Sequence, residues 1–275
     1  MTMIRAGLIG AHIQATRLPR ALEIMCAMEG LELDFTLIDT AERPDFNFDE
    51  CVNDLREKGW TGVTVTHPWK ANAAAYAGDG MVPDVAHLGA SNTLTFGANL
   101  KGWNTDYTGF LAAWNVYGGG PGVVAMAGAG GVARAIGPAL AALKATEIRI
   151  WDVDAGKATA LAAEIGPCAR AVGLDGAREA TRVADGLVNA TALGMGGDGR
   201  SAFPEDCIGG QSWAFDAVYT PTDTPFLKAA AASGLTTISG FDLFQQMALR
   251  SFTAYTGILP NEAAILPQLA QLRPQ

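Results

Sequence analysis

The stretch VVAMAGAGGVARAIG, residues 123–137, decides the fold. Residues 123–127 predict a buried strand, and Gly128-Ala129-Gly130-Gly131-Val132-Ala133 then fits the pattern G-x-G-x-x-A at the start of a predicted helix. The first glycine of this pattern permits a tight turn, the second lets the backbone approach a pyrophosphate, and the third position must be small. The helix N-terminus also offers unpaired N–H groups to phosphates. A glycine-rich turn without a ligand is the alternative, but the flanking strand and helix favour a dinucleotide site at Gly128, Ala129, Gly130, Gly131 and Val132.

The end of the next predicted strand, 147–151, indicates which dinucleotide binds. Asp152 follows that strand, where a carboxylate accepts hydrogen bonds from the adenosine ribose of NAD. The same charge repels a 2′-phosphate, and Val153 and Asp154 supply no cation for one. The sequence therefore predicts NAD as the cofactor rather than NADP.

Outward from this stretch, predicted strands and helices alternate along the chain. Before it, we predict strands at 4–10, 33–38 and 62–66, helices at 19–28 and 49–58, and a hairpin of 90–96 with 100–104. After it, we predict strands at 147–151, 186–189 and 213–218, and helices at 132–143, 155–165 and 241–256. This alternation predicts the α/β class with largely parallel sheets.

A glycine-rich run at 118–122 predicts a loop and is a candidate domain boundary. We therefore expect a substrate-binding and catalytic domain at 1–106 and a Rossmann-like NAD-binding domain at 107–239, with a cleft between them. The C-terminal helices, 240–275, are expected to pack back on the first domain.

Composition and charge exclude several classes of protein. Apolar residues make up 49% of the chain and charged residues 17%, which favours packed cores over disordered tails. The net charge of −9 and the interspersed charges argue against binding to nucleic acid. No apolar run is long enough to cross a membrane, the cysteines have no paired spacing, and the histidines have no metal-ligand spacing. We therefore expect a cytoplasmic protein without a metal site, and the sequence does not predict its oligomeric state.

Three polar clusters follow predicted strands of the first half, at 64–70, 89–93 and 102–106. Ligands of parallel α/β domains collect beyond the carboxyl ends of strands, so the clusters predict one binding site. Turns and a helix cap are the alternative explanation, and they account well for the Asn and Thr residues. They account poorly for Lys70.

The strings TVTHPWK, GASNTL, GWNTD, GAGGVARAI, VNATALGM and FDAVYTP occur in this order. In these strings the sequence resembles the shikimate/quinate dehydrogenase family, from Gly7 to about Gly257. The string THPWK together with Asp152 is more similar to the NAD-dependent quinate/shikimate dehydrogenases than to the NADP-dependent enzymes. The resemblance implies an NAD-dependent oxidoreductase whose small-molecule substrate is a hydroxylated ring acid.

The resemblance also implies roles for individual residues. Lys70 and Asp106 would form the catalytic pair, which we expect to share a proton as a coupled pair. The expected substrate-binding positions are Thr16, Leu18, Thr66, Asn92, Tyr219, Gln246 and Met247. The expected cofactor-binding positions beyond the glycine loop and Asp152 are Asn189, Thr191 and Gly240.

The sequence departs from the family pattern at three substrate positions. Leu18 replaces one of two hydroxyl residues that hold the substrate carboxylate, and Thr16 keeps the other. Met247 replaces a glutamine, although Gln246 precedes it, and Thr64 replaces an asparagine. The hydride chemistry is therefore expected to be intact, while the substrate stays open between a shikimate- or quinate-like acid and another ring, such as an aminoshikimate or other polyol. A non-catalytic NAD-binding regulator is the third alternative.

Overall fold

The computed structural model describes residues 2–274, which form two compact units. Unit 1 comprises the chain up to Thr105 together with Met247–Leu272, and unit 2 comprises Asp106–Gln246 and the residues after Leu272. Two helices carry the chain from one unit to the other, α5 (Thr105–Tyr117) and α10 (Gly240–Thr256). The domain limits expected from the sequence stay a prediction.

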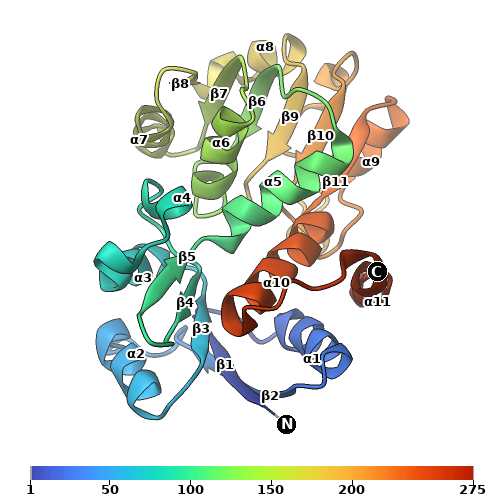
Figure 1. Cartoon of the computed structure of the whole chain (residues 1–275). Helices are drawn as coiled ribbons and strands as arrows, with labels where there is room; N and C mark the ends of the chain where they lie inside the picture. Colours follow the sequence, from blue (N-terminus) through green and yellow to red (C-terminus); the bar gives the residue numbers. More distant parts are fainter. Residues whose placement is uncertain (1, 275) are drawn as a thin grey trace. The chain divides into compact units, whose positions relative to one another are not determined.

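Unit 1 is built on a five-stranded sheet in the order β2-β1-β3-β4-β5 (Figure 1). Its strands are β1 (Met3–Gly10), β2 (Glu32–Asp39), β3 (Gly62–Val65), β4 (Thr93–Thr95) and β5 (Lys101–Trp103). The first three run parallel, and β4 and β5 form an antiparallel hairpin beside β3. Its helices are α1 (Leu18–Met28), α2 (Phe48–Glu57), α3 (Lys70–Ala77), α4 (Pro83–Ala86), the second half of α10, and α11 (Glu262–Leu269).

Unit 2 contains a six-stranded, wholly parallel sheet in the order β11-β10-β9-β6-β7-β8. Its strands are β6 (Val123–Ala127), β7 (Glu147–Trp151), β8 (Ala169–Ala171), β9 (Gly186–Asn189), β10 (Trp213–Asp216) and β11 (Thr236–Ser239). The helices between them are α6 (Ala133–Ala142), α7 (Ala155–Ile165), α8 (Ala177–Arg182) and α9 (Pro225–Ala232). The strand order reverses between β6 and β9, which is where ligands of such sheets bind.

Local side-chain chemistry explains where several of these elements begin and end. Asp154 caps α7, since its carboxylate accepts from the N–H groups of Gly156 and Lys157 at 3.0 and 3.3 Å. Asn47 caps α2 in the same way, and Gly166 ends α7 with a φ of 100°. Buried aliphatic and aromatic side chains form a separate core under each sheet.

The α/β class and the strands predicted before and after the glycine loop are confirmed. One predicted strand, 213–218, ends earlier, at Asp216, because its carboxylate accepts the N–H of Val218 at 2.9 Å and turns the chain. Helices α3, α4, α5, α8 and α9 and strands β8 and β11 were not predicted. Among residues 2–274, no helix has the length and hydrophobicity to span a membrane.

Candidate active site

Lys70 is the first residue of α3, and the aromatic residue before it anchors the turn. The indole N–H of Trp69 donates to Thr40 Oγ1 at 2.9 Å, and its ring stacks on Phe48 with centroids 5.9 Å apart. The carbonyl of Lys70 accepts the N–H of Ser91 at 2.9 Å. The start of α3 is therefore held both to an aromatic cluster and to the segment that leads into β4.

Thr66 lies directly after β3, in the same turn. Its N–H donates to the carbonyl of Ile9 at 2.9 Å, and its carbonyl accepts the N–H of Trp69. A Cβ on Gly10 would lie 2.2 Å from Thr66 Cγ2, so only glycine at that position lets the threonine approach β1. Thr66 is half-buried, so part of its surface is accessible to a ligand.

Asn92 is buried, and its hydrogen bonds fix the orientation of its amide. Its Oδ1 accepts the N–H of Thr105 at 2.7 Å and the hydroxyls of Thr105 and Thr93 at 3.0 and 3.3 Å. Three donors on one oxygen identify that atom as the carbonyl oxygen, which leaves the two N–H groups of Nδ2 for another acceptor. The two N–H groups of Asn92 are thus able to donate to a ligand oxygen, and Asp106 follows the threonine that Asn92 holds.

The second half of α10 is attached to unit 1 by hydroxyl groups. Ser251 Oγ lies 3.1 Å from Thr105 Oγ1 and 3.6 Å from the sulfur of Met247. Thr64 and Tyr255 share a buried hydrogen bond of 2.6 Å, and burial raises the pKa of the tyrosine. Thr64 therefore uses its hydroxyl for the fold.

The loop between β1 and α1 carries Thr16 and Leu18. Thr16 Oγ1 accepts the N–H of Leu18 at 3.3 Å, and the Leu18 side chain is only 2% exposed. The carboxylate of Asp39 holds this loop, since it accepts the N–H groups of His12 and Ile13 at 3.0 and 3.2 Å, and it also accepts the N–H of Ala41 after β2 at 3.0 Å. These backbone hydrogen bonds, the one from Ala41 first, lower the pKa of Asp39. Leu18 presents methyl groups in a closely packed position, with one hydroxyl beside them at Thr16.

In unit 2, the glycine loop has the geometry that a dinucleotide requires. Gly128 has a φ of 97°, and a Cβ there would lie 2.7 Å from the backbone of Ala190. A Cβ on Gly130 or Gly131 would meet no atom of residues 2–274 within 4 Å, so the backbone faces open space. Helix α6 begins two residues later at Ala133, so the loop leads directly into a helix N-terminus, where backbone N–H groups without an intrahelical partner are expected. The residues present therefore fit a pyrophosphate.

Asp152 joins the end of β7 to the glycine loop. Its Oδ2 accepts the N–H of Ala129 at 2.8 Å, and its Oδ1 accepts the N–H of Asp154 at 2.9 Å. Each carboxylate oxygen has a further lone pair for a ribose hydroxyl. Val153 is 91% exposed and brings no positive charge. These groups fit a ribose with free hydroxyls better than one that carries a phosphate.

The loop after β9 lies directly against Gly128, and Asn189 shapes it. Asn189 Oδ1 accepts the N–H and the hydroxyl of Thr191 at 3.0 and 2.7 Å. Its Nδ2 donates to the carbonyl of Leu193 at 3.1 Å and to Asp216 at 2.9 Å. Because the amide is fully engaged, Asn189 would serve a cofactor by holding the loop rather than by direct contact.

Tyr219 and Gly240 occupy one region of unit 2. A Cβ on Gly240 would lie 2.5 Å from the carbonyl oxygen of Ala217, so only glycine permits this approach. The ring of Tyr219 stacks on Phe244 of α10, with centroids 5.5 Å apart and planes at 10°. The stacking fixes the ring of Tyr219, which the resemblance assigns to the substrate.

Helix α10 is continuous through the positions of the replaced glutamine, so there is no shift of register. Gln246 is 5% exposed, and its Oε1 has no hydrogen-bond partner within residues 2–274. Met247 is half-buried and lies beside Ser251. Gln246 and Met247 therefore point in different directions, and the amide of Gln246 is not at the position of Met247.

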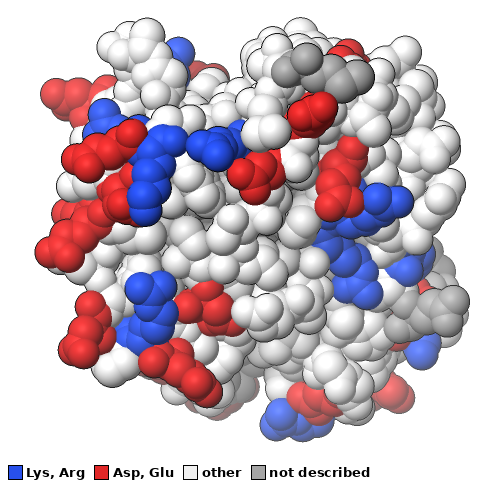
Figure 2. Space-filling view, turned by 90° about the horizontal axis from the view of Figure 1, so that it is seen from below, with Lys and Arg blue, Asp and Glu red and all other residues white. Residues whose placement is uncertain are grey.

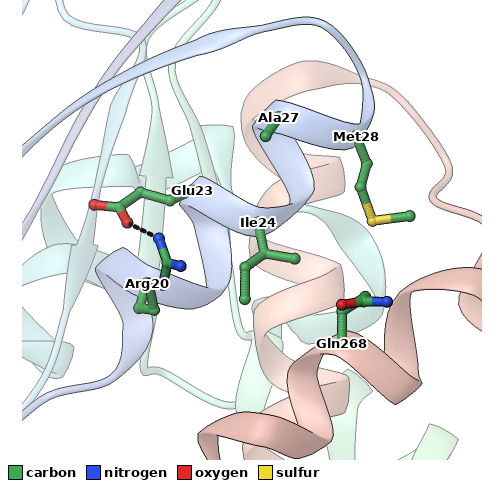
Figure 3. A pocket seen from close by; sticks show the side chains of 6 residues that line it. All are labelled: Arg20, Glu23, Ile24, Ala27, Met28 and Gln268. Carbon is green, nitrogen blue, oxygen red and sulfur yellow. Dashed lines mark hydrogen bonds and ion pairs between the residues drawn. The ribbon is translucent and has the colours of Figure 1, made fainter.

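Two hollows in unit 1 lie away from every expected site residue. One, of about 340 Å³, lies between α1 and α11, where Arg20 pairs with Glu23 at 2.9 Å beside Met28 and Gln268 (Figure 3). The other, of about 460 Å³, is lined by residues that include Trp60, Lys101 and Trp103. On the face shown in Figure 2, acidic and basic side chains are interspersed.

Sequence reasoning assigned no role to Thr105, Ser251 or Asp216, although each holds an expected site residue or its neighbour. Thr105 stands in the string GWNTD and Asp216 in FDAVYTP, so the motifs already contained the signal. Ser251 stands in none of these strings.

The fold defines a two-unit α/β protein with a Rossmann-type unit, and comparison with known proteins identifies its family. Residues 8–94 match the family model described as the shikimate dehydrogenase substrate binding domain. The chain is 34% identical to a quinate/shikimate dehydrogenase (NAD(+)) of Corynebacterium efficiens, with 94% of each chain covered. It is also 34% identical to a shikimate dehydrogenase (NADP(+)) of Thermus thermophilus, with 96% of each covered.

Solved structures give the same result. Quinate dehydrogenase from Corynebacterium glutamicum in complex with NAD superimposes with a TM-score of 0.91 at 28% identity, covering 98% of this chain and 100% of that one. Shikimate 5-dehydrogenase from Thermus thermophilus in complex with NADP(H) and shikimate gives a TM-score of 0.84 at 32% identity, covering 98% and 99%. The chain belongs to the shikimate/quinate dehydrogenase family.

Proposed function

We propose that this chain is an NAD-dependent dehydrogenase that transfers a hydride between a ring secondary alcohol of a shikimate- or quinate-like acid and the nicotinamide. One observation carries the proposal: Asp152 is bonded to the glycine loop beside the exposed, uncharged Val153. The relative from Corynebacterium efficiens, which its name describes as NAD-dependent, supports the same cofactor. The four cysteines are free thiols, which fits a reducing cytoplasm.

The cofactor would be held by unit 2. The N–H groups of Gly130, Gly131 and the residues at the start of α6 would bind the pyrophosphate, and Asp152 would accept from the adenosine ribose. Gly240 would leave room beside the nicotinamide, which supplies the hydride acceptor when NAD is bound.

The reacting alcohol would be handled by residues at the end of β3 and the start of α3. Lys70 would take the hydroxyl proton on Nζ or donate a hydrogen bond to the developing alkoxide, with Asp106 as its coupled partner. Asn92 would donate from Nδ2 to a second substrate oxygen, because its Oδ1 is fully occupied. Thr66 would bind a further hydroxyl, and Tyr219 would complete the contacts to the ring.

A second candidate differs in substrate and not in chemistry. Relative to the family pattern that the sequence resembles, Leu18 and Met247 each lack a polar side chain, and the hydroxyl of Thr64 is hydrogen-bonded to Tyr255. The second candidate substrate is therefore an amino-substituted shikimate or another polyol ring.

The test is a matrix of initial rates, with NAD and NADP each supplied with shikimate, quinate and related ring alcohols. We expect turnover with NAD and at least one ring acid, and a kcat/KM for NAD above that for NADP. Turnover with NADP alone would refute the cofactor assignment. Binding of NAD without turnover of any ring alcohol would favour the non-catalytic regulator.

A further inference from the structure

A buried carboxylate lies at the carboxyl end of β10 in unit 2. Asp216 is 0% exposed. Its Oδ1 accepts the N–H of Val218 and Nδ2 of Asn189, both at 2.9 Å, and its Oδ2 accepts the hydroxyl of Thr224 at 2.6 Å. Two N–H groups donate to Oδ1, and the Thr224 hydroxyl donates to Oδ2 when the carboxylate is ionised, so the ionised form satisfies all three partners.

Asn189 passes this restraint to the loop that follows β9. One N–H of its amide is held by Asp216 and the other by the carbonyl of Leu193. Its Oδ1 is thereby directed at Thr191, whose N–H and hydroxyl both donate to it. The hydroxyl of Thr191 also accepts the N–H of Leu193 at 3.1 Å. Residues 190–193 are therefore closed into a compact turn whose orientation depends on Asp216.

This turn faces the glycine loop. The N–H of Ala190 donates to the carbonyl of Ala127 at 2.8 Å, and a Cβ on Gly128 would lie 3.0 Å from Thr191 Cγ2. Strands β6 and β9 are the neighbours at which the order of the sheet reverses. The turn thus forms one wall of the crevice in which sheets of this type bind dinucleotides.

We propose that Asp216 is a positioning residue for the cofactor: through Asn189, it holds the turn 190–193 against the glycine loop in the shape that binds the dinucleotide. The inference rests on the proposed function, since it requires that unit 2 bind NAD. Asp216 itself would touch neither cofactor nor substrate.

The charge of Asp216 gives this role a dependence on pH. Burial raises its pKa to about 6, although the hydrogen bonds from Thr224, Val218 and Asn189 favour the ionised form. The ionisable groups on neighbouring segments are engaged elsewhere or exposed: Asp198 with Arg200, Asp242 with Ser239, Asp223 with Arg273, and Lys228 in solvent. Since the ionised form holds the turn, affinity for NAD should fall as the pH drops through about 6.

A residue that only stabilised the fold would behave differently. Burial opposes the negative charge of Asp216. The neutral and nearly isosteric Asp216→Asn removes the cost of burying that charge, and its amide places an N–H donor where Oδ2 now accepts from Thr224. A purely structural role therefore predicts that stability and cofactor affinity change together. The positioning role predicts a loss of affinity without a matching loss of stability.

The experiment measures the Kd of NAD by fluorescence titration at pH 5 to 8 for wild type, Asp216→Asn, Thr191→Val and the double variant. We expect Asp216→Asn to weaken binding about tenfold at pH 8, as expected for a hydrogen bond to a charged group, and to flatten the pH profile. Thr191→Val removes the hydroxyl that Asn189 holds, so Asp216→Asn should add less than about threefold in that background. Unfolding of each variant reports stability separately.

Asp185 provides the matched control. It directly precedes β9, at the opposite end of the strand from Asn189, and its Oδ2 accepts the N–H of Val123 at 2.7 Å. Asp185→Asn should leave the Kd of NAD unchanged.

The inference is overturned if Asp216→Asn binds NAD like wild type at pH 8, or if Asp185→Asn weakens binding equally. It is also overturned if the fold-change in the Kd of NAD in the double variant equals the product of the changes in the two single variants. If Asp216→Asn does not fold, the wild-type profile decides: affinity must fall below pH 6, and Thr191→Val must lose most of that dependence. A wild-type protein that does not bind NAD contradicts the proposed function, whereas binding without this coupling contradicts only the role of Asp216.

Discussion

Exchanging two residues at the end of β7 should change the cofactor preference. Asp152→Asn removes the negative charge that opposes a 2′-phosphate, and Val153→Arg adds a guanidinium that can pair with it. Val153 is 91% exposed, so the arginine has room in solvent and should leave the fold intact.

The structure indicates how large the effect should be. Asp152→Asn removes an ionised acceptor for the ribose hydroxyls, and a hydrogen bond to a charged group contributes roughly 1.5–3 kcal/mol. At 1.4 kcal/mol per tenfold, kcat/KM for NAD should fall about 10- to 100-fold. The N–H of Ala129, now 2.8 Å from Oδ2, also loses a charged acceptor, which places the expected loss toward the upper end. Use of NADP should rise over the same range, because repulsion is replaced by a pair.

The assay is kcat/KM for both cofactors in wild type, the double variant, and Val153→Arg alone as the control. The control should gain NADP activity only modestly, since Asp152 still repels the phosphate. The reasoning is refuted if the unmodified enzyme prefers NADP, or if the double variant keeps the wild-type ratio of the two values.

Four further predictions concern other parts of the molecule. Lys70→Ala should lower kcat by roughly 10²–10⁴ with the Kd of NAD unchanged, because the cofactor groups lie in unit 2; a variant with most of its kcat would make the lysine structural. Leu18→Ser should raise kcat/KM for shikimate about tenfold, mainly by lowering KM, and should lower the melting temperature because the new hydroxyl is buried. An unchanged kcat/KM would show that residue 18 does not face the substrate carboxylate. Tyr255→Phe leaves the buried hydroxyl of Thr64 without its partner and should destabilise the protein by about 1–3 kcal/mol in denaturant unfolding. Adding Thr64→Val should recover part of that loss, whereas destabilisations that simply add would argue against the hydrogen-bonded pair. Asp216 has a pKa of about 6 in the folded protein against 3.8 when unfolded, so its contribution to stability is complete below pH 4 and is lost as the pH rises through 6. Between pH 4 and 7 the free energy of unfolding of Asp216→Asn should therefore rise by about 3 kcal/mol relative to that of wild type. A difference that does not change with pH would mean that the carboxylate does not titrate in this range.

Much of the fold follows from short-range patterns. The glycine loop after an apolar strand predicted β6 and α6 of unit 2, and the apolar runs before residue 106 predicted β1, β2 and β3. Strand β11 was missed because Thr236–Ser239 is short and has only two buried residues. Helix α5 was missed because its apolar residues lie all round it, as suits a helix that carries the chain between the units.

The site could be predicted as residue types but not as a set of hydrogen bonds. The strings that contain Lys70, Asn92 and Asp152 placed polar groups at strand ends, which parallel sheets gather at one edge. The N–H groups of Asn92 stay available because Thr105 donates to its oxygen, and the role of Asn189 depends on Asp216. Each contact joins residues far apart in the sequence, so neither can be read from a local pattern.

Hydride transfer can be followed directly with shikimate or quinate that carries deuterium on the ring carbon to be oxidised, by measuring whether the wild-type protein transfers the label to NAD. The wild-type protein should form labelled NADH, with a primary isotope effect on the single-turnover rate. The Lys70→Ala variant should lose this transfer. A protein that binds NAD but transfers no label from any ring alcohol would contradict the proposed function.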